Sequence, residues 1–214
     1  MRLNSIIIFI FLILGLMSIS NAVTNLTACQ NITSSGEYHL NQSIVNSSEN
    51  ICIDIQVDNV SLDCLGNTID GISNAPTTFS IYINNKTNVS VNNCLMKDWF
   101  IPIKIENSNN LSFNNISLYN NMDSILLINS LNNYFSNLNI YNSTNYGLVL
   151  NNSNLNQLDN ISTYNNSNKG IYLYYSDNNT LNNINSFNNG DHGFRFEYSN
   201  YNDINNSVYI YWNF

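Results

Sequence analysis

The chain has 214 residues and a formal net charge of −8, and charged residues make up only 9% of it. Its six Lys and Arg residues exclude a basic nucleic-acid-binding surface, because phosphate contacts depend on many such side chains. Asparagine supplies 49 residues, and the length corresponds to one domain that can bury a continuous apolar core.

Residues 1–22 have the features of a cleaved secretory signal. Arg2 gives a positive start, an apolar run covers 6–16, and the small residues Ser20 and Ala22 stand where a signal peptidase cleaves. An uncleaved signal anchor is the alternative. No later apolar stretch has the length of a membrane span. We therefore expect a secreted or cell-surface protein that meets the membrane only through this segment.

Residues 23–79 are expected to form an N-terminal cap and the first coils of the fold. Strand-like runs lie at 36–40, 51–55 and 60–71. The stretch 71–78 holds Gly, Ser, Asn, Pro and Thr, which predicts a loop projecting from the first coil.

The sequence at 80–214 repeats every 22 or 23 residues, which predicts six coils. Each repeat has a triplet whose first and third residues are apolar, the period of a strand that buries one face. A unit this short cannot bury that face alone, so it must stack on copies of itself in a solenoid. The triplets are Ile81-Tyr82-Ile83, Ile103-Lys104-Ile105, Ile125-Leu126-Leu127, Leu148-Val149-Leu150, Ile171-Tyr172-Leu173 and Phe194-Arg195-Phe196.

Two kinds of solenoid have a repeat of this length. Leucine-rich repeats need a helix or a long convex segment in each unit. The units here are poor in Ala, Glu, Lys and Arg and rich in Asn, Ser, Ile and Tyr. That composition opposes helices and favours short strands joined by tight turns. We therefore predict an all-β parallel β-helix with three short strands in each coil.

Asparagine recurs at one equivalent position of every unit. Its side chain bonds nearby backbone, it tolerates the left-handed conformation, and identical copies can bond one another along a stack. We expect these residues to share one buried bend, with side chains bonded to backbone. They are Asn93, Asn115, Asn137, Asn160, Asn183 and Asn206. A serine series recurs in the same way at Ser108, Ser130, Ser153, Ser176 and Ser199.

Four cysteines in an exported chain suggest disulfides. The segments around Cys64 and Cys94 align, which places both residues at one corner of neighbouring coils, where strands lie only ~4.8 Å apart. Three pairings are possible, and Cys29–Cys52 with Cys64–Cys94 is the most local. Buried free thiols are the alternative for the second pair.

The order of motifs over 29–214 resembles right-handed β-helix proteins of the NosD-like type, which have the fold of the pectate-lyase-like superfamily. The resemblance implies a right-handed, single-stranded parallel β-helix, and it specifies activity poorly. The motifs are Gly-x-Tyr-x-Leu at 36–40, Cys-Ile-x-Ile at 52–55, Asn-Val-Ser-Leu-Asp-Cys at 59–64 and Asn-Cys at 93–94.

Copper delivery is the first activity that the resemblance implies. Copper sites use His, Met or thiolate ligands. The part of the chain after residue 22 has only His39 and His192, far apart in sequence, together with Met96 and Met122. We therefore expect no metal and no cofactor.

Carbohydrate chemistry is the second implied activity, since polysaccharide lyases, hydrolases and uronate epimerases share this architecture. They need paired carboxylates, or a base beside a cation. The sharpest pair is Asp191-His192, but it occupies a turn position that varies between repeats. No catalytic residue is assigned, and a carbohydrate-active enzyme stays the alternative. Two outward carboxylates within ~6–10 Å beside Lys or Arg would favour it.

The remaining candidate is recognition. The outward positions of the triplets, and the positions two residues later, bring tyrosine together with Lys, Arg and Glu, and Lys104 can pair with Glu106 as Arg195 can with Glu197. Tyrosine with polar anchors suits stacking on sugar rings, although it is also a common strand residue. We predict a binding or structural role, with carbohydrate or another envelope component as partner. The candidate residues are Tyr82, Lys104, Glu106, Tyr172, Tyr174, Arg195 and Glu197.

The run 208–214 is apolar and aromatic where earlier coils have Asn and Ser. A terminal coil exposes backbone donors and acceptors that can pair with another chain. The run either covers the core as a plug or docks a partner, and we predict self-association at this C-terminal edge.

Overall fold

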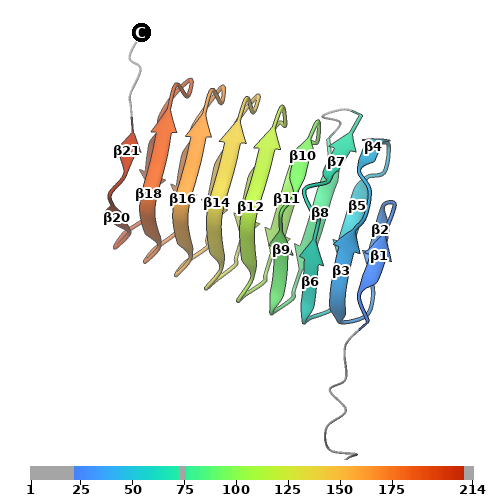
Figure 1. Cartoon of the computed structure of the whole chain (residues 1–214). Coiled ribbons are helices and arrows are strands. Elements are labelled where there is room, and N and C mark those ends of the chain that lie inside the picture. Colours follow the sequence, from blue (N-terminus) through green and yellow to red (C-terminus); the bar gives the residue numbers. More distant parts are fainter. Residues whose placement is uncertain (1–21, 73–75, 210–214) are drawn as a thin grey trace, which may run out of the picture.

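The computed structural model describes residues 22–72 and 76–209, and Figure 1 shows a row of stacked coils. The fold is an all-β parallel solenoid of about eight coils with a spacing of about 23 residues. The described residues contain strands and no helix, which confirms the β-helix and removes the leucine-rich alternative.

One sheet has eight parallel strands, with Ile103 of one coil in register with Ile81 before it and Ile125 after it. Its strands carry the apolar triplets that the repeat predicted. They are β2 (Gln30–Ile32), β5 (Ile51–Ile55), β8 (Phe79–Asn84), β11 (Ile101–Glu106), β13 (Ile125–Ile128), β15 (Leu148–Asn151), β17 (Ile171–Tyr174) and β19 (Phe194–Glu197).

The second sheet has thirteen strands, and it forms the front of Figure 1. Its main path is β1 (Thr24–Leu26), β3 (Gly36–Leu40), β6 (Val60–Asp63), β9 (Val89–Asn92), β12 (Ser112–Tyr119), β14 (Tyr134–Tyr141), β16 (Gln157–Tyr164), β18 (Thr180–Phe187) and β20 (Asp203–Asn205). Four shorter strands join it, namely β4 (Ile44–Ser47), β7 (Thr68–Gly71), β10 (Leu95–Lys97) and β21 (Val208–Tyr209).

The coils from β12 to β18 contain two strands rather than the three expected. In these coils one eight-residue strand replaces the separate pair β9 and β10. An asparagine with a positive φ bends each long strand in its middle, as at Asn115 (54°), Asn137 (54°) and Asn160 (51°). Pairing continues on both sides of the bend because asparagine tolerates the left-handed region better than most residues do.

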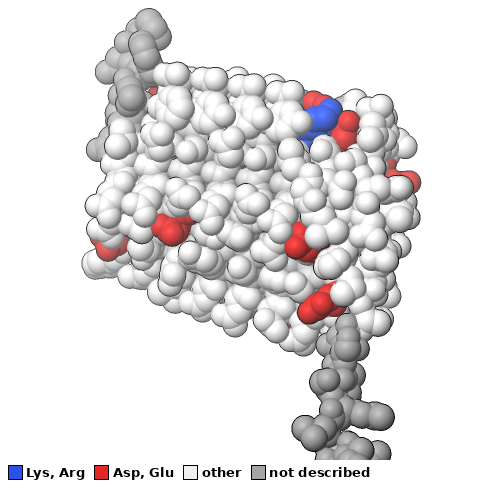
Figure 2. Space-filling view, in the orientation of Figure 1, with Lys and Arg blue, Asp and Glu red and all other residues white. Residues whose placement is uncertain are grey.

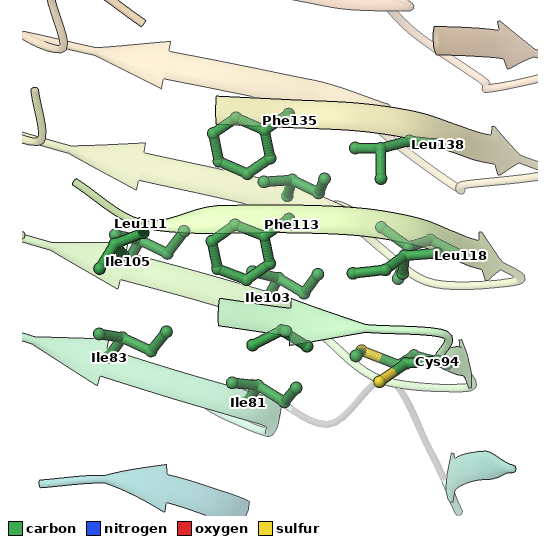
Figure 3. Close-up of a cluster of buried hydrophobic side chains, with 14 of the residues drawn as sticks. Ile81, Ile83, Cys94, Ile103, Ile105, Leu111, Phe113, Leu118, Phe135 and Leu138 are labelled. Carbon is green, nitrogen blue, oxygen red and sulfur yellow. The ribbon is translucent and has the colours of Figure 1, made fainter. Parts of the chain in front are cut away.

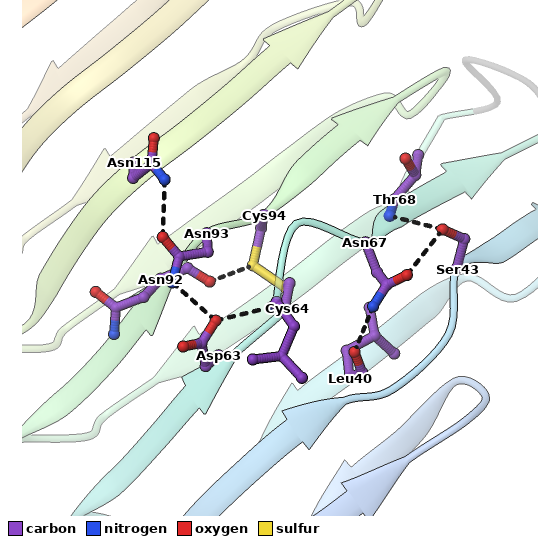
Figure 4. The surroundings of a disulfide bond; sticks show 11 residues. Leu40, Ser43, Asp63, Cys64, Asn67, Thr68, Asn92, Asn93, Cys94 and Asn115 are labelled. Atoms are coloured by element: carbon purple, nitrogen blue, oxygen red, sulfur yellow. Dashed lines mark hydrogen bonds between the residues drawn. A yellow bond between two sulfur atoms is a disulfide. The ribbon is translucent and has the colours of Figure 1, made fainter.

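The predicted asparagine series forms separate hydrogen-bonded pairs rather than one ladder, because Asn137 donates to Asn114 and Asn183 donates to Asp159. The amide of Asn115 donates to Asn93 Oδ1 (2.8 Å), and Asn93 donates to Asp63 Oδ1 (2.9 Å), as Figure 4 shows. Asn160 donates to Asn137 in the same way (2.6 Å). These bonds join side chains rather than backbone, and the residues are exposed or half-buried rather than buried. The expectation of a buried bend was wrong because the left-handed residue turns its side chain outward.

The buried polar ladders lie elsewhere in each coil. The backbone N–H of Ser130 donates to Ser153 Oγ in the next coil (3.1 Å), and Ser153 N–H donates to Ser176 Oγ (3.0 Å). Asn156, fully buried, accepts the backbone N–H of Asn133 and donates to the carbonyl of Ser130. Buried polar groups are stable only when paired, so these ladders fix the turns that join the two sheets.

The apolar core runs the length of the stack between the two sheets. Figure 3 shows part of it, from Ile81 to Leu138. Phe113 and Phe135 stack with ring centroids 4.9 Å apart and planes 5° apart. Five of the six third-position triplet residues have no exposed surface, while Phe196 is half-buried and packs against the core. Burying a side chain of this size contributes roughly 1.5–3 kcal/mol, so the stack is held mainly by this column.

Both disulfides form in the most local arrangement. Cys29 bonds Cys52 with a Cα–Cα distance of 4.3 Å, and Cys64 bonds Cys94 with a distance of 4.9 Å (Figure 4). Each bridge ties one coil to the next.

The two predicted terminal features fall largely outside the described residues. The signal segment 1–22 precedes them except for Ala22, and the run 208–214 follows them beyond residue 209. Among the described residues, no helix has the length and apolar character needed to cross a membrane.

Candidate binding face

The outer face of the eight-stranded sheet holds all the residues that the sequence offered for binding. Because side chains alternate along a strand, the middle residue of each triplet points away from the core. Strand register places these residues in one column, in the order Tyr82, Lys104, Leu126, Val149, Tyr172 and Arg195.

At one end of this column Tyr82, Lys104 and Glu106 form what we call the N-terminal triad. Tyr82 donates its hydroxyl to Glu106 Oε2 (2.5 Å), and Lys104 Nζ lies 3.1 Å from Glu106 Oε1. Lys104 also lies over the rings of Phe79 and Tyr82, 4.9 and 5.7 Å from their centroids. The triad therefore combines an aromatic surface with a fixed pair of opposite charges.

Burial and then the bond to Glu106 raise the pKa of Tyr82 to about 12. Burial also opposes ionisation of Glu106, but the hydrogen bonds from Tyr82 and Lys104 outweigh it and lower the pKa of Glu106. At neutral pH the tyrosine is a proton-bearing donor and the glutamate a charged acceptor.

At the other end Tyr172, Arg195 and Glu197 form the C-terminal triad. Tyr172 donates to Glu197 Oε2 (2.9 Å), and Arg195 Nε donates to Glu197 Oε1 (2.9 Å). The bonds from Arg195 and then Tyr172 lower the pKa of Glu197. Burial, followed by the bond to Glu197, raises the pKa of Tyr172 to about 12. The third tyrosine of the predicted set, Tyr174, lies two residues from Tyr172 with its ring centroid 6.0 Å away.

Lys169 and Tyr146 extend the C-terminal triad, and the sequence did not single them out. Lys169 Nζ lies 5.3 Å from the ring centroids of both Tyr146 and Tyr172. It also pairs with Asp191 Oδ2 at 3.0 Å, and His192 Nδ1 lies beside Asp191 Oδ1. Burial opposes ionisation of Asp191, but Lys169 and His192 outweigh it and lower its pKa. The signal in the sequence was the alignment of Tyr146, Lys169 and His192, each of which directly precedes a glycine in successive repeats.

An apolar strip separates the two triads. It consists of Leu126 on β13 and Val149 on β15, with Ile128 beside them. Val149 is buried although it points outward, and Leu126 and Ile128 are half-buried.

A different cluster of charges lies at the C-terminal ends of β7 and β10 in the thirteen-stranded sheet. Lys97 Nζ is 3.0 Å from Asp70 Oδ2 and 2.9 Å from Asp98 Oδ2, and Figure 2 shows this group over β7 and β10 on a face with few other charges. Bonds to Asp98 and Asp70 raise the pKa of Lys97. Asp70 is buried, and its Oδ1 has no hydrogen-bond partner among the described residues.

The sequence reasoning missed this cluster, in which two carboxylates lie beside one cation, although Asp70 is buried rather than outward. The strand register that pairs Asp70 with Lys97 could have shown it. Between Asp70 and Lys97 the sequence contains the additional segment 71–78, which interrupts the regular spacing of the repeat. In the described part of the chain, no three His, Cys, Asp or Glu side chains gather as a metal site would need.

Solved structures with the same fold differ greatly in sequence from this chain. DFA-IIIase from Arthrobacter chlorophenolicus A6, in complex with GF2, matches 94% of this chain and 62% of its own, with a TM-score of 0.58 and 13% identity. The ORF18 protein of Geobacillus virus E2 matches 88% of this chain and 51% of its own, with a TM-score of 0.58 and 13% identity. A mutant of the periplasmic alginate epimerase AlgG matches 78% and 46%, with a TM-score of 0.50 and 13% identity.

The chain thus spans only 46–62% of the length of these solved structures, and at this identity the likeness concerns the fold alone. No curated protein sequence matches it. The family model described as the right handed beta helix region matches residues 101–212, more than half of the chain. The chain therefore belongs to the right-handed β-helix family.

Proposed function

We propose that this protein is an exported, cell-surface β-helix that binds carbohydrate through the outer face of its eight-stranded sheet. The observation that carries the proposal is the C-terminal triad with its neighbours Tyr146 and Lys169. Tyrosine rings there lie beside hydrogen-bonding charges that are already fixed by one another.

This arrangement suits a sugar for two reasons. Sugar rings have an apolar face that stacks on tyrosine, and their hydroxyl groups both donate and accept hydrogen bonds. Glu197 is an acceptor, while Arg195 is a donor that stays charged at any physiological pH. Because each charge is held by its partner, little side-chain entropy is lost when a ligand binds.

Two further observations support the proposal. Two disulfides in so small a domain are typical of exported proteins, and residues 1–22 have the pattern of a signal. The alginate epimerase, which has the same fold, is named for a polysaccharide and described as periplasmic. Membership of the NosD-like group, with copper delivery, has no comparable support in the described residues.

The test is a glycan array probed with the purified protein and with two variants. Tyr172→Ala should lose at least tenfold in signal on every glycan that the parent protein binds. Tyr134→Ala, a half-exposed tyrosine on the other sheet, is the matched control and should retain it. Equal binding by parent and Tyr172→Ala would reject this face, and an empty array would reject carbohydrate binding.

A carbohydrate-active enzyme is the second candidate, favoured by the Asp70, Lys97 and Asp98 cluster. Both carboxylates pair with one ammonium group, at 3.0 and 2.9 Å, which brings together two acids, the type of residue pair that glycosidases use. Reducing-end release should be measured on each glycan bound in the array. Release that Asp98→Asn abolishes and Asp159→Asn preserves would establish the enzyme, and no release from any bound glycan would leave binding as the function.

A further inference from the structure

We infer that the two triads are the ends of one site, which holds a single uncharged, extended glycan chain lying along the stack of coils. This inference rests on the proposed function, and it adds the orientation, length and charge of the ligand.

The first argument is that the two triads repeat the same device in the same register. In each, a tyrosine donates to a glutamate on the next coil, and the cation two residues before that glutamate pairs with it. Tyr82 is in register with Lys104, and Tyr172 is in register with Arg195. A lysine over two aromatic rings accompanies both triads.

The repetition is not a property of the fold as such. The two intervening coils carry Leu126 and Val149 in the same column, with Ile128 and Asn151 at the glutamate position. These coils are equally well paired and equally buried underneath. If the fold itself required the triad, every coil would carry one. A ligand that contacts the face at two points requires only two triads.

The spacing sets the size of the ligand. Tyr82 and Tyr172 are four strand steps apart, through β11, β13 and β15. At ~4.8 Å per step they are separated by roughly 19 Å. A mono- or disaccharide cannot touch both, whereas a linear chain of several sugars can. The half-buried Leu126 and Ile128 between the triads would contact the apolar faces of the middle sugars.

The charge of the face argues for an uncharged chain. Lys104, Lys169 and Arg195 are each paired with an acid, namely Glu106, Asp191 and Glu197. These three cations of the described face are therefore already compensated before a uronate arrives, and the chain as a whole carries a net charge of −8. A polyuronate would have to break these pairs against a repulsive background, which favours neutral glycans over acidic ones.

The test uses an array with neutral glycans and uronate glycans in matched lengths, from disaccharide to octasaccharide. We expect the signal from neutral chains only, with affinity rising about 10²-fold once a chain is long enough to reach both triads, because the second contact becomes intramolecular. Tyr82→Phe and Tyr172→Phe should each remove most of that rise. The double variant should bind long and short chains with equal, weak affinity.

Tyr→Phe changes remove one hydroxyl and keep the ring, and equal thermal midpoints should show that the fold is intact. Tyr134→Phe is the matched control and should leave the length dependence unchanged. Uronate chains bound better than neutral ones, or short chains bound as tightly as long ones, would overturn this inference while carbohydrate binding stands. If no glycan on the array gives a signal, both this inference and the proposed carbohydrate binding are rejected.

Discussion

Tyr172 donates its hydroxyl hydrogen to Glu197, a residue one coil further along the stack, across 2.9 Å. The same relation links Tyr82 to Glu106 at the other end of the sheet. Neither pair is local in sequence, and each exists only because the coils stack with a fixed register. Any shift in the register between neighbouring coils would therefore break these Tyr–Glu hydrogen bonds.

Acid should remove the contribution of Glu106 to stability. Its pKa is lowered in the folded protein, so folding favours the ionised form. That contribution is fully present above the ordinary pKa of about 4.3 and is lost as the pH falls through the lower folded value. We expect Glu106→Gln to lower the free energy of unfolding by less than about 1 kcal/mol at neutral pH, and the difference to vanish once the pH is below the folded pKa of Glu106.

Urea titrations of parent and variant across this pH range measure the difference. Glu49→Gln, which changes an exposed glutamate, is the control for the loss of one negative charge. A Glu106→Gln effect that stays constant down to the lowest pH would show that the ion pair is not its cause.

Asn156 and Asn137 should differ in their importance, although both belong to repeated series. Asn156 is buried and bonds Asn133, Ser130 and Asn179. Asn156→Ala should cost roughly 2–4 kcal/mol, because it leaves several buried groups unpaired. Asn137 is exposed and left-handed, so Asn137→Ala should cost roughly 1–2 kcal/mol, mainly in backbone strain.

Denaturant midpoints of the two variants test the ranking. Asn137→Gly separates the causes, because glycine accepts a positive φ and should cost less than alanine there. Equal costs for Asn156→Ala and Asn137→Ala, or a glycine variant no better than alanine, would contradict the assignment.

The sequence predicted the stack well and the side-chain environments less well. The apolar triplets have a period that only a strand face can satisfy, so the fold and the register of Ile81, Ile103 and Ile125 followed directly. The recurrence of asparagine identified the bends but not their direction. Whether a repeated polar residue faces in or out depends on the φ of one residue, which the repeat does not encode.

The candidate binding residues were also predictable only in part from the sequence. Tyr82, Tyr172 and their charged neighbours lie on the strands where the repeat is regular, so the column could be read from spacing. Lys97 and Asp70 lie on neighbouring coils, and the segment 71–78 lengthens the chain between them relative to the regular repeat. An insertion changes the number of residues between equivalent positions but leaves the register of the strands intact. The Asp70–Lys97 pair was therefore found only in the structure.

The Cys64–Cys94 disulfide should stabilise the stack by roughly 2–4 kcal/mol, because it closes a loop of 30 residues in the unfolded chain. The double variant Cys64→Ser, Cys94→Ser should lower the free energy of unfolding, measured by urea titration, by that amount. The Cys29–Cys52 bridge closes a loop of similar length, 23 residues. Its removal by Cys29→Ser with Cys52→Ser should therefore cost a similar free energy of unfolding. A double variant as stable as the parent would mean that the bridge does not constrain the unfolded state.

Gly170 should not tolerate any side chain. A Cβ placed there would lie 2.2 Å from Ser186 Oγ and 2.3 Å from Thr163 Oγ1, within a buried polar network that includes Asn189. Gly170→Ala must displace these groups and should cost roughly 1–3 kcal/mol. Removal of the nearest oxygen by Ser186→Ala should relieve part of the clash. The double variant should therefore be more stable than the sum of the two single effects, by at least about 0.5 kcal/mol. Urea titrations of the four proteins measure this coupling, and strictly additive effects would show that crowding is not the reason for glycine at this position.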